Sequence, residues 1–165
     1  MFFLPKGMGA YWGIGLVKVV WKVFATMVDC RIKKSVSLHD ALHGLRVFRF
    51  KRMSTLEAKL MPQLAGIAQK LLFQVFLDVQ KAYNSLDRGW CMEIMWGYGM
   101  GQIMARLIAH HWENLMSVRK AKRFLGTSFV TGRGVMQGYP TSPMISNIVV
   151  DAVVRATFEV VCGPQ

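Results

Sequence analysis

The sequence contains few acidic residues. Nine Asp and Glu stand against 21 Lys and Arg in 165 residues, a formal net charge of +12. The excess is concentrated in residues 1–70, which hold 12 basic and three acidic residues. An imbalance of this size indicates a polyanionic partner, such as nucleic acid or an anionic membrane surface. A basic surface that only keeps the protein soluble is the alternative.

Cysteine is scarce as well. Cys30, Cys91 and Cys162 lie far apart and form no CxxC pair, so the sequence predicts neither a disulfide framework nor a cysteine zinc site. This usage favours a reducing, intracellular setting, in the cytoplasm or the nucleus.

Long uninterrupted apolar runs are also missing. Lys18 and Lys22 interrupt the stretch from Ala10 to Val28, so we expect it to be buried in a folded protein and not to span a membrane. The opening MFFLPKG lacks the pattern of a signal peptide, and secretion is not expected. No repeat or linker divides the chain, and 53% hydrophobic residues can form the core of one domain.

Apolar residues recur at helical spacing in five segments. We expect helices over residues 16–32, about 54–70 with a bend or break at Pro62, 87–98, 102–118, and from Ser142 onward. Ser54 or Thr55 is the expected N-cap of the second helix, and Asp87 that of the third. The first helix is predicted to bury one face, made of Leu16, Val19, Val20, Val23, Phe24, Met27 and Val28.

Two segments have the pattern of strands. LLFQVFLD, residues 71–78, is short and apolar, which is typical of a strand buried on both faces. FLGTSFVTGRGV, residues 124–135, indicates short strands with glycine turns. The first strand would end in Asp78, and burying an unpaired carboxylate costs several kcal/mol. We therefore expect a partner for this charge. The expected helices and short strands together make an α+β fold.

Three groups of residues together carry a family resemblance. FLDVQKAYN (76–84) is followed by GVMQGYPTSPMISNIVVDAVV (134–154), and LPKGMGAYWGIGLVKVVWKV (4–23) with SLHDALHGLR (37–46) precedes both. In this order they resemble the first palm motif, the second palm motif and the fingers segments of the reverse transcriptase domain of retroelements, of the non-LTR retrotransposon and group II intron type. The resemblance implies a right-hand polymerase with fingers over about residues 1–70 and a partial palm over about 71–165, whose helices pack on a small antiparallel sheet.

The resemblance also implies the site. Asp78 would be catalytic and, with the carbonyl of Val79, would bind the Mg²⁺ ions of a two-ion site, because Mg²⁺ prefers oxygen ligands. Tyr83 falls where the family places an aromatic gate against a ribose 2′ hydroxyl. Gln137 and Gly138 would lie beside the incoming deoxynucleoside triphosphate and the templating base.

Basic residues of the fingers would contact phosphates. Lys6 matches a lysine that approaches the triphosphate, and Lys22 and Arg46 match positions near phosphates or template. The implied partners are an RNA or DNA template–primer and deoxynucleoside triphosphates.

The sequence departs from the family in several places. The third palm motif, an aromatic-x-Asp-Asp hairpin, and the thumb are absent from these 165 residues. Trp12, Asn84 and Tyr139 replace common family residues. We therefore expect a fragment of an RNA-directed DNA polymerase that is inactive as this chain. A noncatalytic basic RNA- or DNA-binding module is the alternative, and a membrane-surface protein using the helix at 16–32 is a third.

Each predicted site residue has a purely structural alternative. Asp78 would then cap a turn, Tyr83 would be core, Gly138 would belong to a plain turn and Gln137 would be a solvated loop residue. The neighbours His110, His111 and Glu113 lack the HExxH spacing, and the glycines at 7, 9 and 13 miss the GxGxxG spacing. We assign neither group any chemistry.

Overall fold

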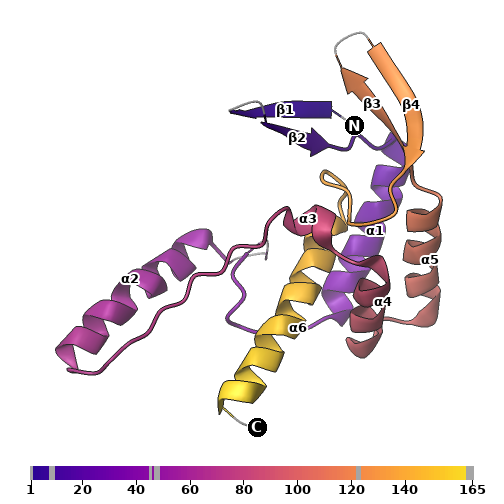
Figure 1. Cartoon of the computed structure of the whole chain (residues 1–165). Helices are drawn as coiled ribbons and strands as arrows, with labels where there is room; N and C mark the ends of the chain where they lie inside the picture. Colours follow the sequence, from indigo (N-terminus) through magenta and orange to yellow (C-terminus); the bar gives the residue numbers. More distant parts are fainter. Residues whose placement is uncertain (1, 8–9, 45, 47–48, 122–123, 163–165) are drawn as a thin grey trace.

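The computed structural model describes residues 2–7, 10–44, 46, 49–121 and 124–162. In these ranges the chain forms two β-hairpins and a helical body, with one long helix lying apart (Figure 1). The expected α+β class is confirmed. The described helices include none long and apolar enough to cross a membrane.

The two hairpins lie next to each other. β1 (Phe2–Gly7) pairs antiparallel with β2 (Ala10–Ile14), and β3 (Met116–Ala121) pairs antiparallel with β4 (Phe124–Val130). β1 also contacts β3. The strand at residues 124–130 was predicted, whereas the first hairpin was missed. The glycines around its turn break any helical or alternating pattern, so the two short strands give little periodic signal.

Helix α1 (Val19–Ser35) buries only part of its predicted apolar face. Its buried residues are Ala25, Val28, Asp29 and Ile32, and α1 contacts α6. Several residues of the predicted face are exposed, namely Leu16, Val19, Val20, Val23 and Met27. The prediction of one buried stretch from Ala10 to Val28 is therefore wrong in its middle, because the side chains of α1 are buried only from Ala25 onward and only on one side of the helix.

The core lies where α4 (Arg88–Gly97), α5 (Gln102–Glu113) and α6 (Ser142–Cys162) meet. The side chains of Met95, Ala105 and Ile148 are fully buried there. As predicted, Asp87 caps α4, and its carboxylate accepts a hydrogen bond of 3.0 Å from the backbone N–H of Trp90. Helix α5 ends before the predicted residue 118 because the chain already enters β3 at Met116.

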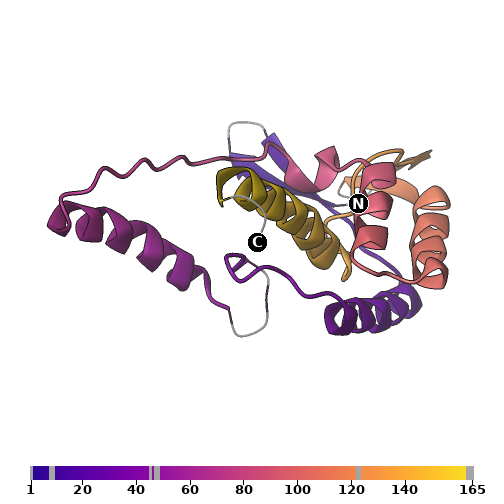
Figure 2. The same ribbon diagram turned by 90° about the horizontal axis from the view of Figure 1, so that it is seen from below.

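Helix α2 (Lys51–Ile67) lies away from the body in both views (Figures 1 and 2). It begins three residues before the predicted cap and runs through Pro62 without a break. Proline has no N–H to donate to the carbonyl of Ala58 four residues earlier. The side-chain amide of Gln74 donates to that carbonyl at 3.1 Å, which replaces the missing bond. The helix ends at Ile67 and does not reach the predicted end at residue 70.

Residues 71–79 do not form the predicted buried strand. This segment is extended but unpaired, and every residue in it is exposed, with Leu71 at 92% and Leu77 at 90%. A strand is stable only when a neighbour satisfies its backbone groups. The four described strands form two separate hairpins, and none of them pairs with this segment.

Candidate nucleotide and nucleic-acid site

Two segments that are distant in sequence meet at the end of the extended segment. The short helix α3 (Ala82–Ser85) follows it, and the backbone carbonyl of Tyr83 accepts a 2.8 Å hydrogen bond from the N–H of Val135. The N–H of Gly134 donates to the carbonyl of Leu86 at 2.9 Å. The structure therefore joins the residues around Tyr83 to the start of the loop that holds Gln137.

Gly134 makes this contact possible. Its φ is +78°, and a Cβ at this position would lie 2.7 Å from both the Cα of Asn84 and the carbonyl oxygen of Tyr83. Only glycine fits, because any side chain would collide with backbone. Gly134 was not among the predicted site residues, although it is the first residue of the 134–154 segment.

The same loop is attached to the first hairpin. Gly15, directly after β2, donates its N–H to the carbonyl of Gln137 at 2.8 Å. A Cβ on Gly15 would lie 2.2 Å from the sulfur of Met136, so glycine permits the close approach. The loop thus connects β2, α3 and the start of α6. Sequence reasoning gave Gly15 no such role.

The predicted site residues on this loop are in a turn. Gly138 is exposed and has a φ of +91°, and the N–H of Tyr139 donates to the carbonyl of Met136 at 3.2 Å. Glycine is therefore favoured at 138 for the turn alone. Gln137 is half-buried. Its position beside a nucleotide stays a prediction.

Tyr83 packs against the hydrophobic core while remaining half-buried. Burial raises the pKa of its phenol above the ordinary value, so the ring is neutral near pH 7. A half-buried, uncharged ring beside the loop is compatible with both the predicted gate and an ordinary packing role.

Asp78 and Val79 lie on the exposed segment before α3. In the part of the chain that the structure describes, no hydrogen bond or ion pair joins Asp78 to the loop at Gln137. The structure brings Tyr83 to the loop but does not enclose Asp78 with it. The exposed segment spares Asp78 the cost of burial, and among the described residues the expected partner of its charge is not found.

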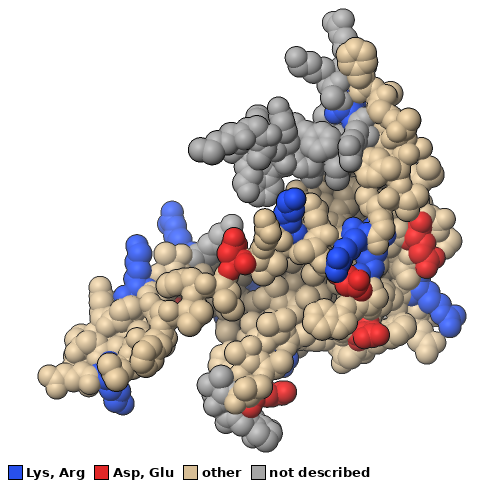
Figure 3. Space-filling view, in the orientation of Figure 1, with Lys and Arg blue, Asp and Glu red and all other residues tan. Residues whose placement is uncertain are grey.

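The three predicted phosphate contacts are distributed over the N-terminal part. Lys6 lies in β1, and its side chain lies outside the described part of the structure. Lys22 is exposed on α1. Arg46 is half-buried and donates through Nη1 to the carbonyls of His39 and Leu42, at 2.8 and 3.2 Å. On the face shown in Figure 3, Lys and Arg side chains are spread over α2 and the body.

A cavity of about 530 Å³ lies beside the loop. Its lining includes Gly15, Lys18, Trp21, His111 and Met136. The ring centroids of His111 and Trp21 are 5.2 Å apart. Burial, reinforced by the charges of Arg88 and His110, lowers the pKa of His111, so its imidazole is neutral at pH 7.

Tyr139 is one of the residues at which the sequence departs from the pattern that it resembles, where an Asp or Ser is common. Its ring is buried and stacks on His111, with centroids 4.8 Å apart. This contact accounts for an aromatic residue at a position where a family member has a small polar one. His111, to which we assigned no chemistry, is thus a packing partner of the loop.

The described carboxylates do not fit a two-ion metal site. Within the described ranges, no three His, Cys, Asp or Glu residues are grouped closely enough to hold a metal ion. Asp151 is fully buried and already accepts hydrogen bonds from the N–H of His39 at 2.5 Å, from the Tyr98 hydroxyl and from Arg155 at 2.6 Å. Asp78 would therefore need further carboxylates to hold two ions.

Comparison with known proteins identifies the family. The family described as reverse transcriptase (RNA-dependent DNA polymerase) matches residues 4–161. The chain belongs to the reverse transcriptase family. It is also 30% identical over 79 residues to a retrovirus-related Pol polyprotein from the type-2 retrotransposable element R2DM of Drosophila melanogaster. That match covers 48% of this chain and 8% of the Drosophila protein, so it spans a small part of the relative.

The family match covers nearly the whole chain. The matched range includes both segments that meet at Tyr83 and Val135. It also includes the hairpin that reaches the loop through Gly15. The family generally uses divalent metal ions, and the role of Asp78 as a metal ligand in this chain stays a prediction.

Proposed function

We propose that this chain provides the fingers, about residues 1–70, and part of the palm, about residues 71–165, of an RNA-directed DNA polymerase. The backbone contact between Tyr83 and Val135 carries the proposal, because it brings together the two segments that resemble the palm motifs. The two stretches lie about fifty residues apart in sequence, and the hydrogen bond from Val135 to Tyr83 places them side by side.

The positions of the side chains are compatible with the proposed roles. Asp78 is an exposed carboxylate, available to an ion, and the carbonyl of Val79 is next to it. Tyr83 offers a flat, neutral ring to the sugar of a deoxynucleotide. Gln137 and Gly138 belong to the turn that the same contact holds in place.

The proposed partners are a template–primer of RNA or DNA and deoxynucleoside triphosphates, in an intracellular setting. Lys6, Lys22 and Arg46 would contact phosphates, and the net charge of +12 supports attraction of a polyanion. We further propose that these 165 residues by themselves do not catalyse, because Asp78 is the one carboxylate at a position matching the family's metal ligands. Added carboxylates would let Mg²⁺ bind and neutralise the developing charge.

Binding of a template–primer tests the function. Its affinity should fall steeply between about 50 and 200 mM salt, with a log–log slope of about −0.7 to −0.9 for each phosphate neutralised. Lys22→Ala should reduce the slope by about one such step, and Lys70→Ala on the exposed chain after α2 is the matched control. Absence of binding at low salt, or an affinity that salt does not change, would contradict the proposal.

A further inference from the structure

Helix α6 carries a polar stripe, made of Asn147, Asp151 and Arg155, that faces a distant part of the chain. Residues four apart lie on one face of a helix. Each of the three side chains bonds the backbone of residues 37–44. Asn147 donates to the carbonyl of Gly44 at 2.8 Å, Asp151 accepts from the N–H of His39 at 2.5 Å, and Arg155 donates to the carbonyl of Ser37 at 3.1 Å.

The middle of the stripe is a paired, buried charge. Burial alone would raise the pKa of Asp151, but hydrogen bonds from Tyr98, Arg155 and the N–H of His39 outweigh it, so its pKa lies below the ordinary value. The guanidinium of Arg155 also lies 5.9 Å from the Tyr98 ring centre. A buried carboxylate with all these partners has little freedom to move, because losing any one is costly.

The stripe connects to Arg46 through the segment it holds. Arg46 donates through Nη1 to the carbonyl of His39, the residue whose N–H bonds Asp151. It also donates to the carbonyl of Leu42, between His39 and Gly44. The backbone that orients the guanidinium is thus the backbone that α6 binds.

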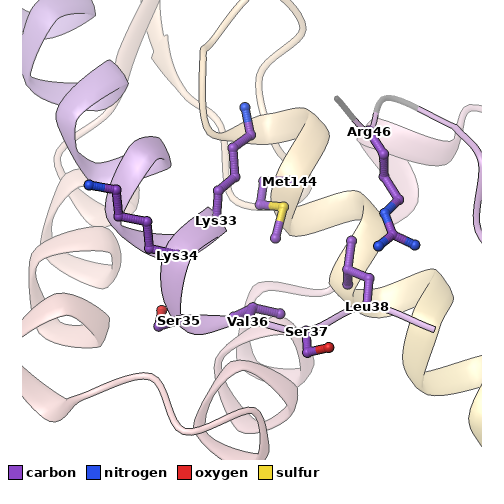
Figure 4. A pocket seen from close by; sticks show the side chains of 8 residues that line it. All are labelled: Lys33, Lys34, Ser35, Val36, Ser37, Leu38, Arg46 and Met144. Atoms are coloured by element: carbon purple, nitrogen blue, oxygen red, sulfur yellow. The ribbon is translucent and has the colours of Figure 1, made fainter. Parts of the chain in front are cut away.

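Arg46 lines a basic cavity of about 400 Å³. Figure 4 shows Lys33 and Lys34, from the end of α1, on one side of it and Arg46 on the other, with Met144 of α6 between them. Lys33 is paired with Asp29 at 2.5 Å. Among the described residues, Lys34 and Arg46 form no ion pair, so the cavity carries uncompensated positive charge.

We propose that the cavity lined by Lys33, Lys34 and Arg46 binds a phosphate group of a nucleic-acid strand, and that the polar stripe of α6 positions Arg46 for this contact. The inference rests on the proposed function, because it assigns part of the nucleic-acid contact. Guanidinium groups bind phosphate through fixed, paired donors, so their orientation matters more than that of a lysine ammonium.

The cavity is tested with the whole chain and a short single-stranded RNA. Arg46→Ala and Lys34→Ala should each make the salt slope of the affinity shallower by about 0.7, one phosphate contact on a single strand. Lys59→Ala, on the exposed helix α2, removes the same charge outside the cavity and should change the slope less. Equal effects of all three substitutions would overturn the site while leaving nucleic-acid binding intact. If the unmodified chain does not bind the RNA, both proposals are overturned.

The positioning role is tested with Asn147→Ala, which changes no charge. It should weaken RNA binding about fivefold, the factor that corresponds to one hydrogen bond of ordinary net strength. The loss should disappear in an Arg46→Ala background, because the stripe acts through Arg46. A merely structural role would weaken binding equally in both backgrounds, and that result would overturn the positioning role. Thermal unfolding of each variant shows whether it is folded.

Asp151→Asn gives a second test, because an effect of charge and an effect of positioning would change the RNA affinity in opposite directions. It removes a negative charge, which through charge alone would strengthen binding to a polyanion. Through positioning it should weaken binding, because the bonds to Arg155 and Tyr98 lose strength. Glu159→Gln, exposed on the same helix, is the matched charge control. Stronger binding by both variants would overturn the positioning role, and Asn147→Ala decides the question if Asp151→Asn does not fold.

Discussion

At the scale of single residues, glycines determine how the loop meets α3. We expect Gly134→Ala to lower the free energy of unfolding by about 2–4 kcal/mol, because it combines a positive φ with overpacking against backbone. Urea denaturation measures the change. Gly97→Ala, in α4 with nothing within 4 Å of its Cβ position, is the control and should cost little. Equal stability of the two variants would show that the loop moves away from α3 without cost.

His111 is expected to make stability depend on pH. Its pKa is lowered in the folded protein relative to 6.5, so below about pH 6.5 the unfolded chain takes up a proton that the folded chain resists. Stability should therefore fall as the pH decreases from 6.5 toward the folded pKa. His111→Phe, which keeps a ring to stack on Tyr139, should show a smaller decrease. Unfolding at pH 7.5 and 5.5 compares them, and identical decreases would contradict the assignment.

At the scale of elements, the cap of α4 contributes measurably. Asp87→Ala should lower the free energy of unfolding by about 0.5–2 kcal/mol, because the N–H of Trp90 loses its acceptor. Asp87→Asn keeps an acceptor oxygen and should retain most of the stability. Denaturant unfolding gives both values. A similar loss in the two variants would mean that the charge, and not the cap hydrogen bond, is responsible.

Helix α2 should be the least protected helix. Its apolar side chains, Met53, Leu56, Leu60, Met61, Leu64 and Ile67, are exposed, so tertiary packing adds little to its stability. We expect its amides to exchange with deuterium much faster than those of α6 near Ile148. Hydrogen-exchange mass spectrometry makes the comparison, with α4 as an internal reference. Equal protection of α2 and α6 would show that α2 packs against a partner in solution.

At the scale of the whole molecule, catalysis depends on the number of carboxylates. We expect residues 1–165 to extend no primer on an RNA template with Mg²⁺ or Mn²⁺, because one carboxylate holds these ions weakly. Addition of a family-type aromatic-x-Asp-Asp segment and thumb should permit extension, and Asp78→Ala should then abolish it. Template-dependent incorporation by residues 1–165, lost in Asp78→Ala, would show that another carboxylate completes the site.

Much of the helical structure could be predicted from sequence, because its signals are local. The cap at Asp87, the spacing of Cys91 and Met95 and the start of α6 at Ser142 involve only neighbouring residues. The strand predicted over residues 71–78 failed for the opposite reason. Its apolar composition indicates a strand, but strand pairing requires a second segment, and local sequence does not specify which.

The candidate site was predicted only as a set of residues. The motifs named Tyr83, Gln137 and Arg46, but they contained no sign of what holds these residues. The roles of Gly15 and Gly134 become visible only when their neighbours in the folded chain are known. In the sequence, a glycine that allows another segment to approach closely looks the same as any other turn glycine. The polar residues of α6 likewise looked like scattered polar positions in an apolar helix.

Composition, charge and motif order determined the family, the basic character and most helices, because each depends on the kinds of residues and their local spacing. The tertiary structure decided which residues meet. Asp151 and His39 are 112 positions apart, and Asn147 and Gly44 are 103 apart. Contacts over such separations depend on how the helices pack. Helix packing closes long loops of the chain, and local sequence preferences do not specify which residues a closed loop brings together. The attachment of Arg46 to α6 was therefore visible only in the folded chain.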